Sequence, residues 1–245
     1  MNSFGITDRG KVRRDNQDSF QIERIDEKSC LVAVLCDGMG GEKAGNIASS
    51  LAAKAFVTHV RERILTSAVR RPDIGTIMIQ AVSAANNMVF GYSCFDAEYT
   101  GMGTTLVAAV IFDGRVFIAN VGDSRAYKLT RTKITQISHD HSLVQEMVDK
   151  GQLSQEEARK HPRRNVITRA LGVDETVPCD IFTPKINKGD KLLLCSDGLT
   201  NMLTDEELLS TAKTGGDLIS IGRQMLDQAL DRGAPDNVTV VLISK

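Results

Sequence analysis

Apolar residues follow two different periodicities, which alternate along the chain. Short continuous or alternating apolar runs, typical of strands, are bounded by turn residues. Longer stretches in which apolar residues recur every three or four positions are typical of amphipathic helices. The strands predicted in this way lie at residues 3–8, 19–24, 30–36, 106–112 and 116–121, within 180–196, and at 237–243. The predicted helices lie at residues 47–60, 72–92, 142–150, 154–161, 205–213 and 217–231.

The order of these elements predicts how they are layered. Strands come in runs joined by hairpins, as at Asp113-Gly114, and helices come in pairs. This order favours an α+β fold of stacked antiparallel sheets flanked by helices over a doubly wound parallel sheet. The polar stretch 142–172, which holds two short helices and the basic segment Arg159–Arg164, is predicted to be a small helical flap. Residues 1–245 are expected to form a single domain.

Composition narrows the classes of function. The formal net charge of −1 gives no overall attraction to nucleic acid or to an anionic membrane. No apolar run reaches the ~20 residues of a membrane helix, and the first residues lack the pattern of a signal peptide. The five cysteines show no Cys-x-x-Cys spacing, which favours reduced thiols and a cytoplasmic protein.

Four aspartates stand where apolar strands begin or end. Asp37 and Asp197 each follow a continuous apolar run and are each followed by glycine. Asp123 follows the run that begins at Val116, and Asp236 precedes the last strand. Strand ends of this kind can converge on one sheet edge, where carboxylates repel one another unless cations lie between them. Hard divalent ions prefer oxygen ligands, so the sequence predicts a carboxylate-bridged metal centre.

Such a centre supplies what the hydrolysis of a phosphate ester needs. Gly38 lets the backbone carbonyl approach an ion, and two ions about 4 Å apart clamp the attacking and the leaving oxygens. A metal lowers the pKa of its bound water from about 15.7 toward roughly 7 to 9, which provides hydroxide near neutral pH. Arg13 matches phosphate oxygens as a bidentate fork, and Asp18 is placed to orient the bound water.

The segment His139-Asp140-His141 has the composition of a metal motif. We nevertheless expect these histidines to have a structural role at the base of the flap rather than to ligate a metal.

Eight short motifs follow one another along the chain: Arg13 with Asn16-Gln17-Asp18, then residues 37–41, 101–105, 121–125, 140–142, 167–172, 196–199 and 236–239. In this order they resemble the metal-dependent type 2C Ser/Thr protein phosphatases, the PPM family, in their compact bacterial form. The resemblance covers nearly the whole chain. It implies an αββα sandwich of two antiparallel β-sheets flanked by helix pairs. It also implies hydrolysis of phosphoserine and phosphothreonine in proteins by water or hydroxide that bridges two Mn²⁺ or Mg²⁺ ions, without a covalent intermediate.

The resemblance also implies the ligands of each ion. Asp37, Asp197 and Asp236 would hold the first ion. Asp37 and the carbonyl of Gly38 would hold the second. Asp123 and Asp197 would hold a weaker third ion near the flap.

The substrate side of the site follows from the same resemblance. Arg13 would grip the phosphate, while Asp18 and Asn237 would surround and orient the ligands. The flap at 142–172 would touch the phosphoprotein. Phosphorylated proteins are the implied partners, and the implied opponent is a Ser/Thr kinase; neither nucleic acid nor a membrane is expected as a partner.

Two other functions remain open on the sequence. The first is a catalytically weak regulatory module that binds phosphoproteins, although a pure binder has no need of clustered carboxylates. The second is a carboxylate-metal nuclease, which predicts a basic track for nucleic acid. The only basic cluster, Arg159–Arg164, is short and lies in the flap.

Glu42 stands where members of the family often carry histidine, a candidate proton donor to the leaving alcohol. A carboxylic acid donates a proton only if its pKa is raised, and bound cations lower it. We therefore predict weak assistance to the leaving group. Hydrolysis of phosphoserine should be slowed more than hydrolysis of aryl phosphates, which have good leaving groups. Glu42→His should raise the ratio of the phosphoserine rate to the aryl phosphate rate; an unchanged ratio in parallel steady-state assays would refute the role of Glu42.

Overall fold

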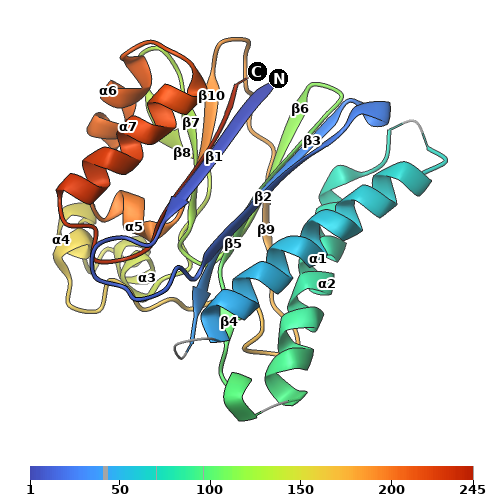
Figure 1. Cartoon of the computed structure of the whole chain (residues 1–245), viewed down its shortest axis with the longest axis horizontal. Coiled ribbons are helices and arrows are strands. Elements are labelled where there is room, and N and C mark those ends of the chain that lie inside the picture. Colours follow the sequence, from blue (N-terminus) through green and yellow to red (C-terminus); the bar gives the residue numbers. More distant parts are fainter. Residues whose placement is uncertain (41–43, 70, 96, 245) are drawn as a thin grey trace.

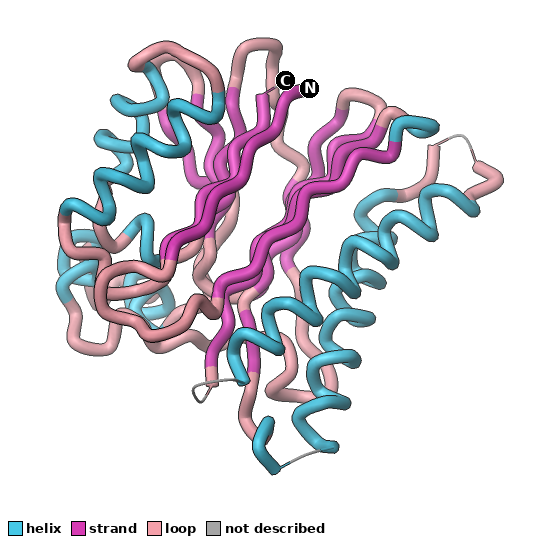
Figure 2. The backbone as a smooth tube through the Cα atoms, viewed as in Figure 1, coloured by secondary structure: helices cyan, strands magenta, loops and turns pink. Residues whose placement is uncertain are grey.

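The structure, a computed structural model, describes residues 1–40, 44–69, 71–95 and 97–244. Its strands form two antiparallel sheets that lie face to face, with helices on the outer side of each sheet (Figure 1). The tube in Figure 2 shows the strands as the two inner layers and the helices as the outer ones. This arrangement confirms the predicted α+β sandwich.

The two sheets are built from strands that are distant in sequence. Sheet A has five strands in the order β1 (Asn2–Asp8), β11 (Val238–Ser244), β10 (Lys191–Cys195), β7 (Arg125–Leu129) and β8 (Ile134–Gln136). Sheet B has the order β2 (Asp18–Ile25), β3 (Cys30–Met39), β5 (Leu106–Phe112), β6 (Arg115–Val121) and β9 (Asp180–Phe182), with β4 (Gly103–Thr104) paired to the end of β3. The first and last strands of the chain thus pair in sheet A, which brings the two termini together (Figure 1).

The helices cover the outer faces in two groups. Sheet B carries α1 (Ala44–Thr66) and α2 (Ile74–Phe95), and sheet A carries α5 (Asp197–Thr200), α6 (Asp205–Lys213) and α7 (Leu218–Asp231). Two short helices, α3 (Leu143–Asp149) and α4 (Gln155–Lys160), lie at one end of the sandwich, and the 3₁₀ turns are η1 (Asp26–Lys28) and η2 (Ala97–Tyr99). None of the helices in the described ranges is both long enough and apolar enough to cross a membrane.

Strand alternation divides the apolar side chains among three cores. In β3, for example, Leu31, Ala33 and Leu35 point between the two sheets. Their neighbours Val32 and Val34 point toward α1 and α2. The third core lies between sheet A and helices α5 to α7. A strand that is buried on both faces has no polar face, which explains the continuous apolar runs seen in the sequence.

Capping residues begin several of the helices. Thr204 opens α6 with a capping box, in which its side chain accepts from the N–H of Glu207 and the Glu207 carboxylate accepts from the N–H of Thr204. Ser154 and Glu157 do the same for α4. Both signals are visible in the sequence, and the predicted starts of these two helices agree with the structure within a residue.

Several elements differ from the sequence-based boundaries, and three differences are the largest. Strand β3 continues past Cys36 to Met39, because Gly38 and Met39 pair with β4. Helix α1 extends beyond Val60 as far as Thr66. Residues 180–196 form only the short strands β9 and β10, with a loop between them.

The packing of α1 against sheet B gives a prediction for stability. Phe56 of α1 is completely buried in the core formed with α2 and sheet B. Phe56→Ala should therefore lower the free energy of unfolding by about 3–5 kcal/mol. The ring of Phe95 is 93% exposed, so Phe95→Ala should change it by no more than about 0.5 kcal/mol. Urea denaturation of both variants checks this, and similar losses in the two would contradict the assigned core.

Candidate metal centre and substrate cavity

The topology brings four strand ends to one edge of the sandwich. In sheet B, β3 and β6 both run antiparallel to β5, so Asp37 near the end of β3 and Asp123 just after β6 lie on the same side. In sheet A, β10 ends beside the start of its antiparallel neighbour β11, which places Asp197 and Asp236 next to each other in the fold. The predicted convergence of the four aspartates is therefore what the strand order produces.

A cavity of about 210 Å³ lies between these strand ends. All four aspartates line it, together with Arg13, Gln17, Gly38, Met39, Gly40, Thr105, Asn165, Ile167 and Asn237. Asn165 and Ile167 belong to the 142–172 segment, so this segment forms part of the cavity wall. The sequence analysis placed Thr105 and Ile167 within family motifs but gave neither a role in the site, and it did not single out Asn165.

Burial and like charge both oppose ionisation of three of these carboxyl groups, those of Asp37, Asp123 and Asp197. Burial raises the pKa of Asp37 well above its usual range, and the neighbouring carboxyl groups, that of Asp18 most of all, raise it further. Burial, followed by the charge of Asp197, also raises the pKa of Asp123. Burial, followed by the charge of Asp236, raises the pKa of Asp197 to about 6. The four groups thus lie close enough to repel one another.

Asp18 lies directly opposite Asp37 in the pairing of β2 with β3. Its Oδ2 accepts hydrogen bonds from Ser196 Oγ at 2.8 Å and from Thr239 Oγ1 at 2.6 Å. Its Oδ1 is buried and has no hydrogen-bond partner among the described residues. Burial raises the pKa of Asp18 to about 7, although the two hydroxyl groups favour the charged form. One oxygen of Asp18 is therefore available to orient a ligand.

The N-terminal loop that carries Arg13 is fastened to the start of β11. Arg13 Nη2 donates to Asp236 Oδ2 at 2.8 Å. The side chain of Asn237 accepts from the N–H of Gln17 at 2.8 Å and donates to the carbonyl oxygens of Arg9 and Asp15, at 2.8 and 3.0 Å. Asn237 therefore holds this loop, and Arg13 with it, beside the aspartates.

The backbone of Asp37 is held by Thr104 and Thr105, at the junction between β4 and β5. The N–H of Asp37 donates to Thr105 Oγ1 at 3.0 Å, and its carbonyl oxygen accepts from Thr105 N and Thr104 Oγ1, both at 2.9 Å. The next residue, Gly38, lies against the backbone of Gly45 in α1, so closely that a Cβ atom at position 38 would stand 2.1 Å from the Gly45 carbonyl oxygen. Glycine at 38 is thus required by packing as well as by access to the carbonyl.

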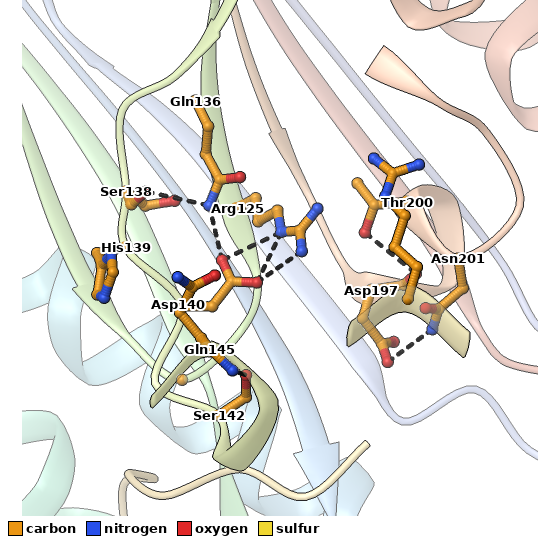
Figure 3. A network of polar contacts seen from close by, with 12 residues as sticks. Arg125, Gln136, Ser138, His139, Asp140, Ser142, Gln145, Asp197, Thr200 and Asn201 are labelled. Atoms are coloured by element: carbon orange, nitrogen blue, oxygen red, sulfur yellow. Dashed lines mark hydrogen bonds and ion pairs between the residues drawn. The ribbon is translucent and has the colours of Figure 1, made fainter. Parts of the chain in front are cut away.

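Two separate polar groups face each other near the start of the 142–172 segment (Figure 3). Asn201 Nδ2, one helical turn after Asp197, donates to Asp197 Oδ2 at 3.0 Å. Across from them, Arg125 holds both oxygens of Asp140, with Nη2 at 2.7 Å from Oδ2. Gln136 Nε2 donates to the same carboxylate at 2.7 Å. The four-residue spacing between Asp197 and Asn201 is a signal that the sequence contains, because residues four apart on a helix are neighbours.

The two histidines at the base of this segment bind different partners. His139 Nε2 lies 2.8 Å from Asp149 Oδ2 in α3. His141 Nδ1 accepts from the N–H of Gly122, the residue before Asp123, at 3.1 Å. Burial lowers the pKa of His141, which favours the neutral ring, and Nε2 lies 3.2 Å from Asp180 Oδ2 and 3.1 Å from Arg169 Nη1. Neither histidine lines the cavity, which agrees with the prediction that both have a structural role.

The donor set suits a hard divalent cation. The cavity offers carboxylate oxygens, whose mutual repulsion a cation would relieve, and the unpartnered Oδ1 of Asp18 stands beside them. In the described part of the chain, no group of three or more His, Cys, Asp or Glu side chains is arranged so that it could hold a metal ion. Oδ2 of Asp236 is bonded to Arg13 and Oδ2 of Asp197 to Asn201, so one oxygen of each of these carboxylates already has a partner within the protein. Glu42 lies outside the described residues.

The raised pKa values give a prediction for the metal-free protein. Asp18 has a pKa of about 7 when folded and an ordinary value of 3.8 when unfolded, so between these values the folded state binds more protons. Stability should therefore fall as the pH rises from about 5.5 to 8, and added Mn²⁺ should restore more stability at pH 8 than at pH 5.5.

Asp18→Asn keeps a side-chain carbonyl for the two hydroxyl groups and removes the charge. Thermal melts in EDTA should show a weaker pH dependence for this variant than for the wild type. A metal-free wild type that becomes more stable between pH 5.5 and 8 would contradict the assigned repulsion.

Comparisons with known proteins agree with this geometry. The profile of the protein phosphatase 2C family matches residues 10–242. The serine/threonine phosphatase stp of Listeria innocua is 38% identical over 239 residues, which cover 98% of this chain and 94% of that protein. The crystal structure of the serine/threonine phosphatase Stp1 from Staphylococcus aureus superposes with a TM-score of 0.91 at 38% identity, covering 99% of this chain and 94% of that one.

A further solved structure, the catalytic domain of the serine threonine protein phosphatase PstP in complex with two manganese ions, has a TM-score of 0.83 at 33% identity. It covers 98% of this chain, and this chain covers 96% of it. A family profile and relatives of more than 30% identity thus match almost the entire sequence. The chain belongs to the protein phosphatase 2C (PPM) family of Ser/Thr protein phosphatases, in its bacterial form.

Proposed function

We propose that this protein hydrolyses phosphoserine and phosphothreonine in proteins with the help of two Mn²⁺ or Mg²⁺ ions and without a covalent intermediate. The observation that carries the proposal is the single cavity lined by four aspartates and one arginine at the edge shared by the two sheets. Carboxylates bind the cations, and a guanidinium binds phosphate. No nucleophilic side chain is needed.

Different aspartates of the cavity are proposed to bind different ions. Asp37, Asp197 and Asp236 hold the first ion, while Asp37 and the carbonyl of Gly38 hold the second. Asp123, with Asp197, holds a weaker third ion. When bound, the ions supply an activated water and neutralise charge on the phosphate.

The remaining residues orient the substrate and the solvent. Arg13 has five N–H donors, and its bond to Asp236 uses one of them, so the guanidinium can bind phosphate oxygens from the edge of the cavity. Asp18 accepts a hydrogen bond through its free Oδ1 and so orients solvent next to Asp37. Asn237 keeps the Arg13 loop in place. Glu42 stands at the position of the family's candidate proton donor, and we propose that it assists the departure of the alcohol only weakly.

We further propose that residues 1–245 act as one catalytic domain, in which the 142–172 segment is a flap over the substrate. Support comes from Asn165 and Ile167, which lie on the cavity wall. Phosphorylated proteins are the proposed substrates, and a Ser/Thr kinase is the proposed opponent. All five cysteines are free, in keeping with a reducing, cytoplasmic environment.

Asp37→Asn tests the proposal, because this residue is shared by both principal ions. We expect turnover of a phosphothreonine peptide to require Mn²⁺ and to fall about 100-fold or more in the variant, in line with several kcal/mol of charge stabilisation. Asp113→Asn is the matched control: it changes another Asp-Gly pair, but in an exposed hairpin turn, and should keep full activity.

Thermal melts in EDTA show whether a loss of activity is a loss of folding. Asp37→Asn removes a buried like charge, so the metal-free variant should be at least as stable as the wild type. Activity that survives both EDTA and Asp37→Asn would overturn the metal mechanism. Metal-dependent binding of the peptide without turnover would instead identify a regulatory module.

A further inference from the structure

A second, smaller cavity of about 50 Å³ adjoins the first and shares Asp123 and Asp197 with it. Figure 3 shows two facing walls of this cavity, with Arg125, Asp140 and Gln145 on one side and Asp197 and Asn201 on the other. The volume holds about three to five water molecules. It therefore suits the head of one small polar side chain and excludes a large one.

The charges around this cavity do not cancel. Arg125 and Asp140 neutralise each other through their bidentate pair. Asp123 and Asp197 belong to the proposed metal ligands and are balanced by the ions. Two further arginines of the 142–172 segment, Arg159 and Arg164, also line the cavity. With metal bound, the cavity is thus left with positive charge.

Both flap arginines are available for a new partner. Arg159 lies 3.5 Å from Asp205 at the start of α6, with 43% of its side chain exposed, and such exposed pairs contribute less than about 1 kcal/mol. Arg164 is exposed, and its guanidinium forms no ion pair with any residue in the described ranges. A carboxylate is the side chain that accepts hydrogen bonds from a guanidinium fork, whereas a lysine or arginine would be repelled.

We propose that this cavity is a subsite for one aspartate or glutamate side chain of the substrate, close to the phosphorylated residue. The proposal rests on the phosphatase function proposed above and adds a substrate class to it: phosphoproteins with an acidic residue near the phosphosite. Arg159 and Arg164 bind the carboxylate, while the phosphate lies in the neighbouring cavity between Arg13 and the aspartates.

The test uses the full chain, Mn²⁺ and a set of phosphothreonine peptides in a neutral scaffold. Glutamate, glutamine or lysine is placed in turn at each of the flanking positions, and kcat/KM is measured. At one position the wild type should prefer glutamate over glutamine by about five- to tenfold, and lysine should be the poorest. Because the contact is ionic and partly exposed, the preference should shrink as NaCl is raised.

Arg164→Gln and Arg159→Gln should each reduce the ratio of kcat/KM for the glutamate peptide to that for the glutamine peptide, and the double variant should bring it close to 1. Arg163→Gln is the matched control. It removes the same charge from the same exposed loop, but Arg163 does not line the cavity, so both the ratio and the activity should stay at their wild-type values.

Binding provides a readout that is independent of turnover. Fluorescence anisotropy with non-hydrolysable phosphonate versions of the glutamate and glutamine peptides should show the same preference in Kd, and the double variant should lose it. An equal kcat/KM for all three peptides, a preference for lysine, or a preference that Arg163→Gln reduces as strongly as Arg164→Gln would overturn the subsite. If the wild type hydrolysed none of the peptides, the proposed function itself would fail.

Discussion

Repulsion among carboxyl groups at one edge of the sandwich is the constraint on which the rest of the structure depends. Asp37 and Asp18 face each other across two paired strands, and both resist ionisation because they are buried. Such an arrangement is unfavourable for a folded chain by itself. It is tolerated because two sheets with three apolar cores hold the strand ends rigidly. A bound cation would relieve this repulsion.

Neighbouring polar side chains partly offset the negative charge of the aspartates. Arg13 lies against Asp236, and Asn201 donates to Asp197, so two of the four carboxylates already have partners within the protein. The loop between strands that carries Asp123 is fixed by the ring of His141 through the N–H of Gly122. The base of the 142–172 segment and the cavity are therefore parts of one hydrogen-bonded unit.

The sequence predicted the layers and the four aspartates because both depend on local patterns. Apolar runs identify buried strands, and an aspartate at the end of such a run is visible without knowledge of the partner strand. Other features depend on which strands are neighbours. Thr105 holds the backbone of Asp37, although 68 positions separate them in the chain, and Asn165 reaches the cavity only because its segment folds back over the strand ends. No local pattern encodes contacts of this kind.

The contact between Gly38 and Gly45 has a consequence for how the centre can evolve. Two bare backbones meet there, one from the strand that carries Asp37 and one from the first turn of α1. No side chain lies between them to absorb a displacement. A shift of the long helix along the sheet would therefore also displace the strand that carries Asp37, which limits how far α1 can change its position during evolution.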